Sequence, residues 1–582
     1  MDAKQEARLR RRATSSTAVE GEVQGATTSS SSTSAATTPA SEEGITWGFA
    51  FVALLFIRHF SAKSNLIHDC DEVFNYWEPL HYLLYKSGFQ TWEYSSEFAL
   101  RSYLYLLLHA LVAGPAAWWY GGGPGKVHVF YATRLALGIF SAASEAALVS
   151  ASSRRFGKRL AAYTLMLLCF SSGCFNSSTS LLPSTFSMYT ISSATAALMS
   201  GRPLLAVVAA VVGVLIGWPF SVLATAPIVV YSLVRDGLLR TIVVGISTSV
   251  AILIPSILAD RFFYGKWTSS IVNLVMYNVF GDGDSSLYGV ESRTFYLRNG
   301  FNNFNFALVL ALMLPFLMLL VRRKNSYLLL VLVSPIYIWL GFMSMQPHKE
   351  ERFLYPVYTL ICLAAAATVE MIPEMAFGSN RSSQTSTLFM ALKICRPVIL
   401  GIILVTSYSR TTSLLNGYSA PMKVLSYLPT ARQGTGASPN DTIVCIGSEW
   451  HRFPSSFFLP SPSYKVQWLD IGFDGLLPMP FNASVGGTAA APSYFNKLNK
   501  ASAEQFMTNK DACNYLLELD LHRKELLLRG SNRTLWEVIV ELPYLDNERS
   551  PMLQRAFFIP WSWQTSNTFG TYRLLRKKQA RA

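Results

Sequence analysis

Side chains able to take up a proton are concentrated in one short stretch near the start of the chain. Four carboxylates fall within ten residues of the run His68-Asp69-Cys70-Asp71-Glu72-Val73-Phe74-Asn75-Tyr76-Trp77-Glu78-Pro79. Bulky apolar residues are interleaved with them, which indicates a partly buried edge where a carboxylate faces a cavity. A carboxylate so placed can act as general base on a hydroxyl group. Asp69, Asp71 and Glu72 are the candidates, and a solvated loop is the alternative interpretation.

A compact basic cluster lies between two apolar runs in the second half of the chain. His348, Lys349 and Arg352 fall within five residues of the segment Gln346–Pro356. Arginine binds phosphate through a planar fork of donors, and lysine binds it as a point charge. Cations of this kind stabilise a phosphate leaving group as charge builds on it. The alternative interpretation is a girdle at the membrane edge with internal salt bridges.

The two clusters together favour a glycosyl transfer from a phosphate-linked donor. A sugar joined to a membrane lipid by a phosphate would be a suitable donor, since the phosphate leaves without help from an acid. One base that activates an acceptor hydroxyl opposite the leaving group gives inversion at the anomeric carbon.

Composition places these clusters in a membrane protein. The chain has 582 residues, of which 51% are hydrophobic and 14% charged, whereas soluble domains carry roughly 25% charged residues. The net charge of +14 is carried by short clusters beside apolar runs, a pattern typical of cytoplasmic loops. No basic stretch is interleaved with aromatic residues as in a nucleic-acid surface, so we expect no nucleic-acid partner.

Apolar runs of spanning length indicate a mainly α, polytopic architecture with about 10–13 transmembrane helices, each of roughly 20 residues. Candidate spans cover residues 45–60, 98–118, 128–150, 159–175, 184–200, 203–234, 238–259, 305–321, 326–345, 353–373 and 390–408. The run 203–234 contains two prolines and is expected to be two short helices or one kinked helix.

Basic loops predict the orientation of these spans. The basic segments Arg8–Arg12 and Arg322–Lys324 should be cytoplasmic. Counting spans from each of them places both chemical clusters on the opposite, lumenal side. The basic loop Arg154–Arg159 disagrees with this count. Either segment 98–118 lies at the membrane interface, or the charge rule fails there.

Changes in composition divide the chain into three parts. Residues 1–44 are rich in Ser, Thr and Ala and predict a disordered cytosolic tail. Residues 45–419 form the transmembrane catalytic module with its lumenal loops. Residues 420–582 predict a small lumenal α/β domain.

Within the last part, short runs predict individual elements. Strands are expected at Thr442–Ile446 and Trp536–Val540, and helical periodicity appears near 502–520. Cys445 and Cys513 would form a disulfide if the region is lumenal. Three glycosylation sequons begin at Asn440, Asn482 and Asn532.

Several motifs resemble those of glycosyltransferase family 22, the mannosyltransferases of the endoplasmic reticulum that use dolichyl-phosphate mannose. The resemblance extends from about residue 45 to the C-terminus. The matching segments are His68–His81, Trp92–Tyr103, Gly300–Asn305, His348–Phe353 and Glu449–Phe458. The first and fourth motifs are long and specific.

The resemblance implies a GT-C type fold whose active site faces the lumen of the endoplasmic reticulum. It implies α-1,2-mannosyl transfer from dolichyl-phosphate mannose to the dolichyl-diphosphate-linked oligosaccharide, as the seventh and ninth mannose of N-glycosylation. Alternatives are another step of the family, such as α-1,6 addition or GPI-anchor mannosylation, and a lipid flippase or transporter. A transporter should show inverted repeats and charges at mid-span, and the sequence shows neither clearly.

The matched motifs also imply roles for individual residues. Asp71 matches the acidic position that we expect to be the base, with Asp69 and Glu72 as the nearest alternatives. The residues implied for the donor phosphate are His348, Lys349, Arg352 and, as a weaker candidate, Arg101. The residues considered for acceptor contact are Glu449, His451 and Arg452, for which domain packing is the alternative.

We expect no cofactor. The pattern Asp69-x-Asp71 resembles the metal-binding acids of transferases that use nucleotide diphosphates. Here the donor would be a monophosphate with cationic residues beside it, so a divalent metal is the less favoured hypothesis.

Overall fold

The computed structural model describes residues 44–281, 285–321, 326–375, 387–429, 441–482, 486–523 and 529–578. Gly44–Ala582 form one compact unit. The predicted tail before residue 44, the loop Arg322–Lys324 and the sequon at Asn440 lie outside the described residues. The proposed division at residue 419 stays a prediction.

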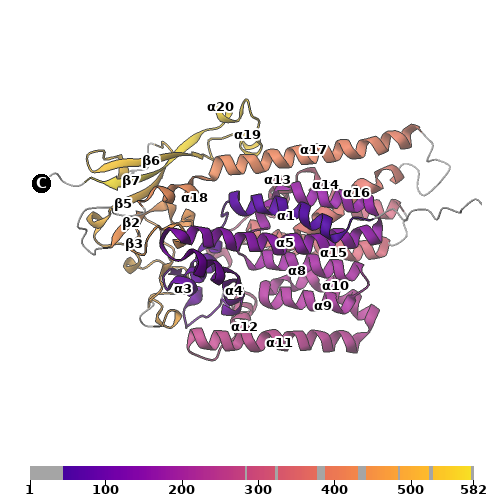
Figure 1. Ribbon diagram of the computed structural model, residues 1–582, viewed down its shortest axis with the longest axis horizontal. Coiled ribbons are helices and arrows are strands. Elements are labelled where there is room, and N and C mark those ends of the chain that lie inside the picture. The colour runs from indigo at the N-terminus through magenta and orange to yellow at the C-terminus, as the bar shows by residue number, and fades with distance from the viewer. Residues whose placement is uncertain are drawn as a thin grey trace, which may run out of the picture. The chain divides into compact units, whose positions relative to one another are not determined.

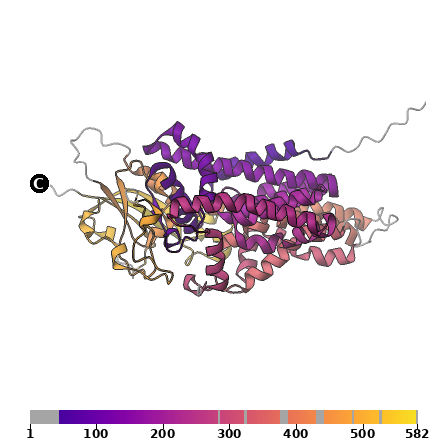
Figure 2. The ribbon, with the colours of Figure 1, turned by 90° about the horizontal axis from the view of Figure 1, so that it is seen from below.

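The long helices run side by side, and the strands of the C-terminal part gather at one end of them (Figures 1 and 2). These helices are α1 Trp47–Ser64, α4 Tyr103–Tyr120, α5 Lys126–Phe156, α6 Lys158–Phe170, α8 Pro183–Met199, α9 Pro203–Val212, α10 Val222–Asp236, α11 Leu238–Tyr264, α14 Phe306–Leu320, α15 Ser326–Met345, α16 Tyr358–Met375 and α17 Thr387–Tyr418. Shorter helices connect them: α2 Cys70–Glu72, α3 Glu78–Tyr85, α7 Ser172–Ser177, α12 Ser270–Val275, α13 Phe295–Phe304, α18 Ala420–Val424, α19 Met552–Ala556 and α20 Trp563–Ser566.

Local sequence signals set where several helices begin and end. Thr46 caps α1 by accepting a hydrogen bond from the amide of Phe49. Helices α5 and α10 end at Gly157 (φ 104°) and Gly237 (φ 87°), a conformation that strains any residue with a side chain. The run 203–234 is divided into α9 and α10, which is the first of the two alternatives expected from the sequence.

Among the residues that the structure describes, five helices are long and apolar enough to cross a membrane by length and composition. They are Gly123–Phe156, Leu238–Tyr264, Tyr327–Met345, Glu351–Glu374 and Phe389–Tyr418. A sixth is obtained if α13 and α14, which meet at a bend of 113°, are one broken span. Helix α4, which covers most of segment 98–118, does not meet this test. The total number of spans therefore stays a prediction.

A small α/β portion follows the last long helix, as the sequence predicts. Its five-stranded sheet has the order β3-β2-β5-β7-β6, with β5–β7 and β7–β6 antiparallel and the other pairs parallel. The strands are β2 Thr442–Ile446, β3 Tyr464–Trp468, β5 Tyr515–Asp520, β6 Trp536–Leu545 and β7 Phe569–Lys577. The strands predicted at Thr442–Ile446 and Trp536–Val540 are thus confirmed.

Two further features of this part were expected from sequence, with different outcomes. The disulfide between Cys445 and Cys513 is formed. The prediction of a helix near 502–520 from its periodicity was wrong, because the end of that segment is strand β5. Residues 515–519 are all buried, so the strand lacks the alternation that marks a half-exposed strand.

A second, two-stranded sheet joins the first loop to the C-terminal part. Strand β1, Phe89–Gln90, pairs with β4, Met479–Pro480. Beside it the buried carboxylate of Glu78 accepts hydrogen bonds from the amide of Ser456 (2.6 Å), the hydroxyl of Ser455 (2.7 Å) and the amide of Phe89 (3.0 Å). These contacts fix the acidic loop against the sheet portion.

Candidate active site

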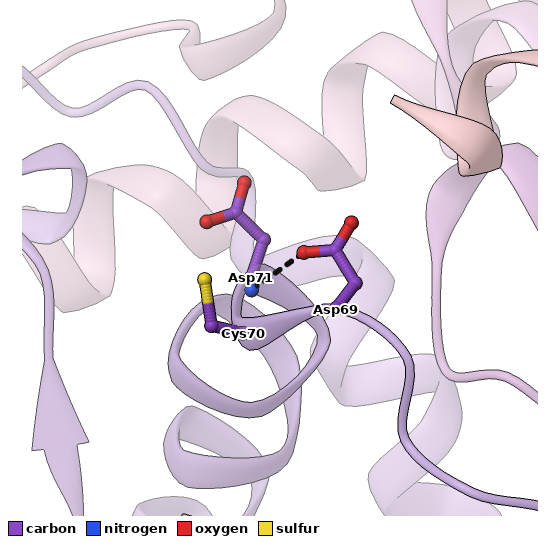
Figure 3. Close-up of side chains that lie close together, drawn as sticks. All are labelled: Asp69, Cys70 and Asp71. Atoms are coloured by element: carbon purple, nitrogen blue, oxygen red, sulfur yellow. Dashed lines mark hydrogen bonds between the residues drawn. The ribbon is translucent and has the colours of Figure 1, made fainter. Parts of the chain in front are cut away.

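The acidic motif forms a short helical turn at the end of the bundle. Asp69 caps α2, and its Oδ1 accepts a hydrogen bond of 2.8 Å from the amide of Asp71. The carboxylates of Asp69 and Asp71 project to the same side of this turn (Figure 3). The two acids are thus presented together, by one cap and one turn.

The basic motif meets this turn through a single guanidinium. Arg352 Nε lies 2.9 Å from a carboxylate oxygen of Asp69, and its Nη2 lies 2.6 Å from one of Asp71. The same group pairs with Glu350. The Arg352 side chain is only 11% exposed, and charge-assisted bonds of this kind are strong when partly buried. The two motifs that the sequence places on one membrane face therefore converge.

A second arginine approaches Asp71 from the other side. Arg101 lies 3.9 Å from the carboxylate of Asp71. Its guanidinium donates two hydrogen bonds to Glu93, of 2.9 and 3.0 Å, and one of 2.7 Å to the hydroxyl of Tyr76. Glu93 and Tyr76 thus hold Arg101 in place. Asp71 therefore lies between two guanidinium groups.

Burial and nearby charges shift the pKa values of the acids around Arg352 in opposite directions. Burial raises the pKa of Asp69 to about 8, although Arg352 opposes the shift. Burial acts in the same direction on Glu350, but Arg352 and the hydrogen bond from His348 outweigh it and lower the pKa of Glu350 to about 2. Near neutral pH the cluster therefore keeps one proton on Asp69 while Glu350 is charged.

A cavity of about 860 Å³ opens beside this cluster. Asp69 and Arg352 line it, whereas Asp71 and Arg101 do not. The side chain of Asp71 is nevertheless 34% exposed, against 18% for Asp69. The cavity has a further polar lining that includes Arg298, Asn299, Asn302, Glu351, Arg410, Arg452, Tyr544 and Arg555. Such a wall suits a ligand with many hydroxyl groups.

Three residues predicted for the site, Glu72, Lys349 and His348, make contacts within the protein, and their roles stay predictions. Glu72 is buried and accepts hydrogen bonds from Trp77 Nε1 (3.0 Å) and the amide of Leu181 (2.9 Å). Lys349 is also buried, and its ammonium donates to the backbone carbonyls of Glu291 and Gln346.

His348 pairs with Glu350 at 3.0 Å. The hydrogen bond to Glu350 raises the pKa of this histidine. His348 therefore reaches the charge cluster only through Glu350.

The C-terminal motif forms one wall of the cavity. His451 and Arg452 line it, while Glu449 is buried and pairs with Arg452 at 2.8 Å. Arg452 also donates a hydrogen bond of 2.9 Å to the hydroxyl of Tyr544. Glu449 thus orients Arg452, and of the three only His451 and Arg452 are open to a ligand in the cavity.

The acidic turn groups three side chains of types that bind metal ions. One ligand atom from each of Asp69, Cys70 and Asp71 lies within 4.8 Å of the others. Arg352 already contacts oxygens of both carboxylates, so a cation would have to displace it or lie beside a positive charge. The residues present fit a guanidinium better than a divalent metal.

Comparison with known proteins identifies the family. Residues 49–460 match the model of the Alg9-like mannosyltransferase family, which is more than half of the chain. The chain belongs to the Alg9-like mannosyltransferase family. The predicted membership and the predicted class of enzyme, an α-1,2-mannosyltransferase, are confirmed.

Two relatives, one from a plant and one from a mammal, agree with the family assignment. The α-1,2-mannosyltransferase ALG9 of Arabidopsis thaliana is 54% identical over 92% of this chain and 93% of its own length. The protein of the same name from Mus musculus is 36% identical over 91% and 89%. A crystal structure of ArnT from Cupriavidus metallidurans bound to undecaprenyl phosphate is 16% identical, with a TM-score of 0.49 over 73% of this chain and 86% of its own.

Membership places this mannosyltransferase among multi-pass membrane enzymes that act on lipid-linked oligosaccharides. The flippase and transporter alternative is not favoured. Sequence reasoning missed Glu350, Glu93 and Tyr76 as members of the charge cluster. Glu350 lies inside the basic motif and Glu93 inside the second matched motif, so both were within reach. The position of Tyr76 depends on the π-helical turn Val73–Trp77, which the sequence does not indicate.

Proposed function

We propose that this mannosyltransferase transfers mannose from dolichyl-phosphate mannose to a hydroxyl of the lipid-linked oligosaccharide, with Asp71 as general base. The observation that carries the proposal is the contact of Arg352 with both acids of the turn. It brings the proton acceptor and the phosphate-binding cation to one point. The acceptor hydroxyl would lose its proton to Asp71 as its oxygen attacks the anomeric carbon, and the bond to the phosphate would break with inversion.

Donor binding and base activation would be coupled at Arg352. A donor phosphate that binds Arg352 and Arg101 competes with Asp71 for the same guanidinium groups. Release of this ion pair would leave the Asp71 carboxylate free to accept a hydrogen bond from the acceptor hydroxyl. The base would therefore become active only when the donor is present. Glu72 and Lys349 would serve structure, and His348 would act through Glu350.

Asp69 lines the cavity, whereas Asp71 does not. Asp69 would be a second candidate for the base only in its deprotonated form, because its pKa is raised to about 8. The acceptor would occupy that cavity, whose volume of about 860 Å³ lies in the range of roughly 300–1,000 Å³ typical of ligand sites. Arg452 and His451 would contact its sugars.

The test is transfer from dolichyl-phosphate mannose to defined acceptor glycans by purified protein. Loss of transfer in Asp71→Asn with retained donor binding supports Asp71 as the base. Full activity of Asp71→Asn together with an inactive Asp69→Asn reverses the assignment. The number and position of the mannoses added follow from the products, which we expect to be the seventh and ninth.

No metal is required in this scheme, because Arg352 lies where a cation would bind. We expect full activity in the presence of a chelator. Activity that is lost with chelator and restored by one divalent ion would contradict the scheme.

The site would face the lumen of the endoplasmic reticulum. The disulfide Cys445–Cys513 supports this orientation, since disulfides persist in oxidising compartments. In sealed microsomes the sheet portion should resist added protease until detergent is present. Digestion without detergent would contradict lumenal placement.

A further inference from the structure

Four exposed apolar side chains lie on α19 and on the segment that joins it to α20. Met552 is 67% exposed, Leu553 68%, Ile559 40% and Trp561 85%. Large apolar side chains gathered on a surface mark a site of interaction with a protein or a membrane. None of these four takes part in the charge cluster of the active site.

This segment, residues 552–561, is attached to one short stretch of α17. The amide of Phe558 donates to the carbonyl of Ser409 at 3.1 Å, and the hydroxyl of Ser409 donates to the carbonyl of Phe558 at 2.9 Å. One turn later the hydroxyl of Ser413 donates to the carbonyl of Arg555 at 2.6 Å. In Figure 1, α19 and α20 lie beside the end of α17 that is nearest the sheet.

The position of Ser409 along α17 matches the edge of a bilayer. The candidate span of α17 runs from Phe389 to Tyr418, which at about 1.5 Å per residue is about 45 Å and longer than the hydrocarbon layer of about 30 Å, so the edge of that layer falls within the helix. The exposed apolar stripe of α17 ends at the level of Ser409. It consists of Met390, Ile394, Val398, Ile402, Val405 and Tyr408, spaced three or four residues apart on one face.

The exposed side chains of residues 552–561 therefore continue the lipid-facing stripe of α17 at the level of the headgroups. Aromatic residues such as Trp561 are enriched at this level in membrane proteins. We propose that Leu553 and Trp561 insert into the interfacial layer of the bilayer, so that residues 552–561 form a membrane anchor.

The anchor has a consequence for the neighbouring cavity. Met552, Arg555 and Ala556 of the same segment line the cavity. An anchored segment would keep this wall of the cavity at the membrane surface. An acceptor carried on a lipid would then meet the cavity without leaving the bilayer; this second step rests on the proposed function.

Fluorescence in vesicles tests the anchor without reference to activity. The full chain with Cys395→Ser, which removes an exposed cysteine, receives Leu553→Cys or Trp561→Cys and an NBD label. The parent without the new cysteine corrects for labelling elsewhere. The matched control is Leu535→Cys, since Leu535 is 50% exposed and apolar but precedes β6.

The control position is far from the anchor by geometry. Gly417 of α17 lies against Leu545 at the other end of β6, and ten residues of strand cover about 33 Å. In dioleoylphosphatidylcholine vesicles we expect blue-shifted emission at positions 553 and 561, with quenching by doxyl-labelled lipid, and neither effect at 535.

Two outcomes would overturn the anchor. Labels at 553 and 561 that emit like the label at 535 would show both positions in water. A blue shift without quenching by doxyl lipid would show that protein, such as a second copy of the chain, covers them. Because both exchanged side chains are largely exposed, these variants should fold.

An activity measurement tests the second step. The double change Leu553→Asp with Trp561→Asp should raise the KM for an acceptor on a long polyprenyl chain and leave kcat unchanged. An acceptor on a short, water-soluble chain should show the parent KM. An equal change with both acceptors would contradict the role of the anchor. If the parent itself transfers no mannose, the proposed function fails, while the quenching result stands.

Discussion

Arg352 Nη2 and the carboxylate of Asp71 lie 2.6 Å apart although 281 positions separate the two residues. One residue comes from the turn that follows the first long helix, and the other from the segment that precedes α16. Any chemistry assigned to either motif therefore depends on the pair. The expectations below test this pair and the structure that holds it.

Asp71→Asn should abolish mannose transfer while the protein still folds and binds donor. The amide keeps the shape of the carboxylate but cannot accept a proton, and a general base contributes about 10²–10⁴-fold in rate. Initial rates with saturating donor measure the loss, and Glu97→Ala, an exposed acid of the same loop, is the control. A rate within a few-fold of the parent would exclude Asp71 as base.

Arg352→Lys should weaken donor binding even though the positive charge is kept. A lysine ammonium cannot reach Asp69, Asp71 and Glu350 at once with the geometry of a planar fork. Equilibrium binding of dolichyl-phosphate mannose should weaken, while binding of the acceptor glycan stays close to the parent value. Unchanged donor affinity would remove Arg352 from the phosphate site.

That the two motifs meet was largely predictable from the sequence. Which residue of each motif lines the cavity, and which is buried, was not. Both motifs flank apolar runs, so span counting was enough to place Asp71 and Arg352 on one face. Neighbours in sequence, however, have different surroundings. Asp69 lines the cavity, Asp71 faces Arg101, and Glu72 is buried against Leu181. This depends on the rotation of one helical turn, which composition does not encode.

The same limit applies to the basic motif and to the C-terminal part. Lys349 and Arg352 have the same local charge pattern, yet Lys349 reaches backbone carbonyls and Arg352 reaches the acids. Strand β5 was mistaken for a helix because it is buried on both faces. Isolated local signals, such as the strand at Thr442–Ile446, were sufficient where one face or one short run decides the structure.

The protonation of Asp69 predicts how stability changes with pH. Its pKa is raised to about 8 in the folded protein, so folding favours the protonated form. The stabilisation is complete below the unfolded value of about 4 and is lost as pH rises towards 8. Glu350, with a pKa of about 2, does not titrate between pH 5 and 9.

Asp69→Asn imitates the protonated acid at every pH. Its thermal stability relative to the parent should therefore increase steadily from pH 5 to pH 8. Differential scanning fluorimetry of both proteins in the same detergent measures the difference. A difference that stays constant over this interval would show that Asp69 is charged throughout.

Glu78→Ala should loosen the joint between the acidic loop and the sheet portion. Four donors, the hydroxyl of Ser455, the amide and hydroxyl of Ser456 and the amide of Phe89, would be left buried without their acceptor, at a cost of roughly 1–3 kcal/mol for each unsatisfied group. We expect a lower Tm and faster proteolysis near residue 455. Stability equal to that of the parent would show that the Glu78 hydrogen bonds do not hold the acidic loop against the sheet portion.

Replacement of both Cys445 and Cys513 by serine should destabilise the sheet portion. The bridge joins residues 68 positions apart, and a disulfide typically contributes about 2–4 kcal/mol. Thermal unfolding with and without reductant measures the effect, since reductant should lower the Tm of the parent and leave the variant unchanged. A parent insensitive to reductant under unfolding conditions would contradict the expectation.

The order of the five-stranded sheet makes it depend on the last of its strands in the sequence. Strand β7, Phe569–Lys577, lies between β5 and β6, so an interior strand is the last of the five to be synthesised. Strands β5 and β6 emerge earlier and wait with unpaired edges until β7 fills the gap. A nonsense or frameshift change as late as residue 568 would therefore remove an interior strand and leave β5 and β6 without the strand that joins them.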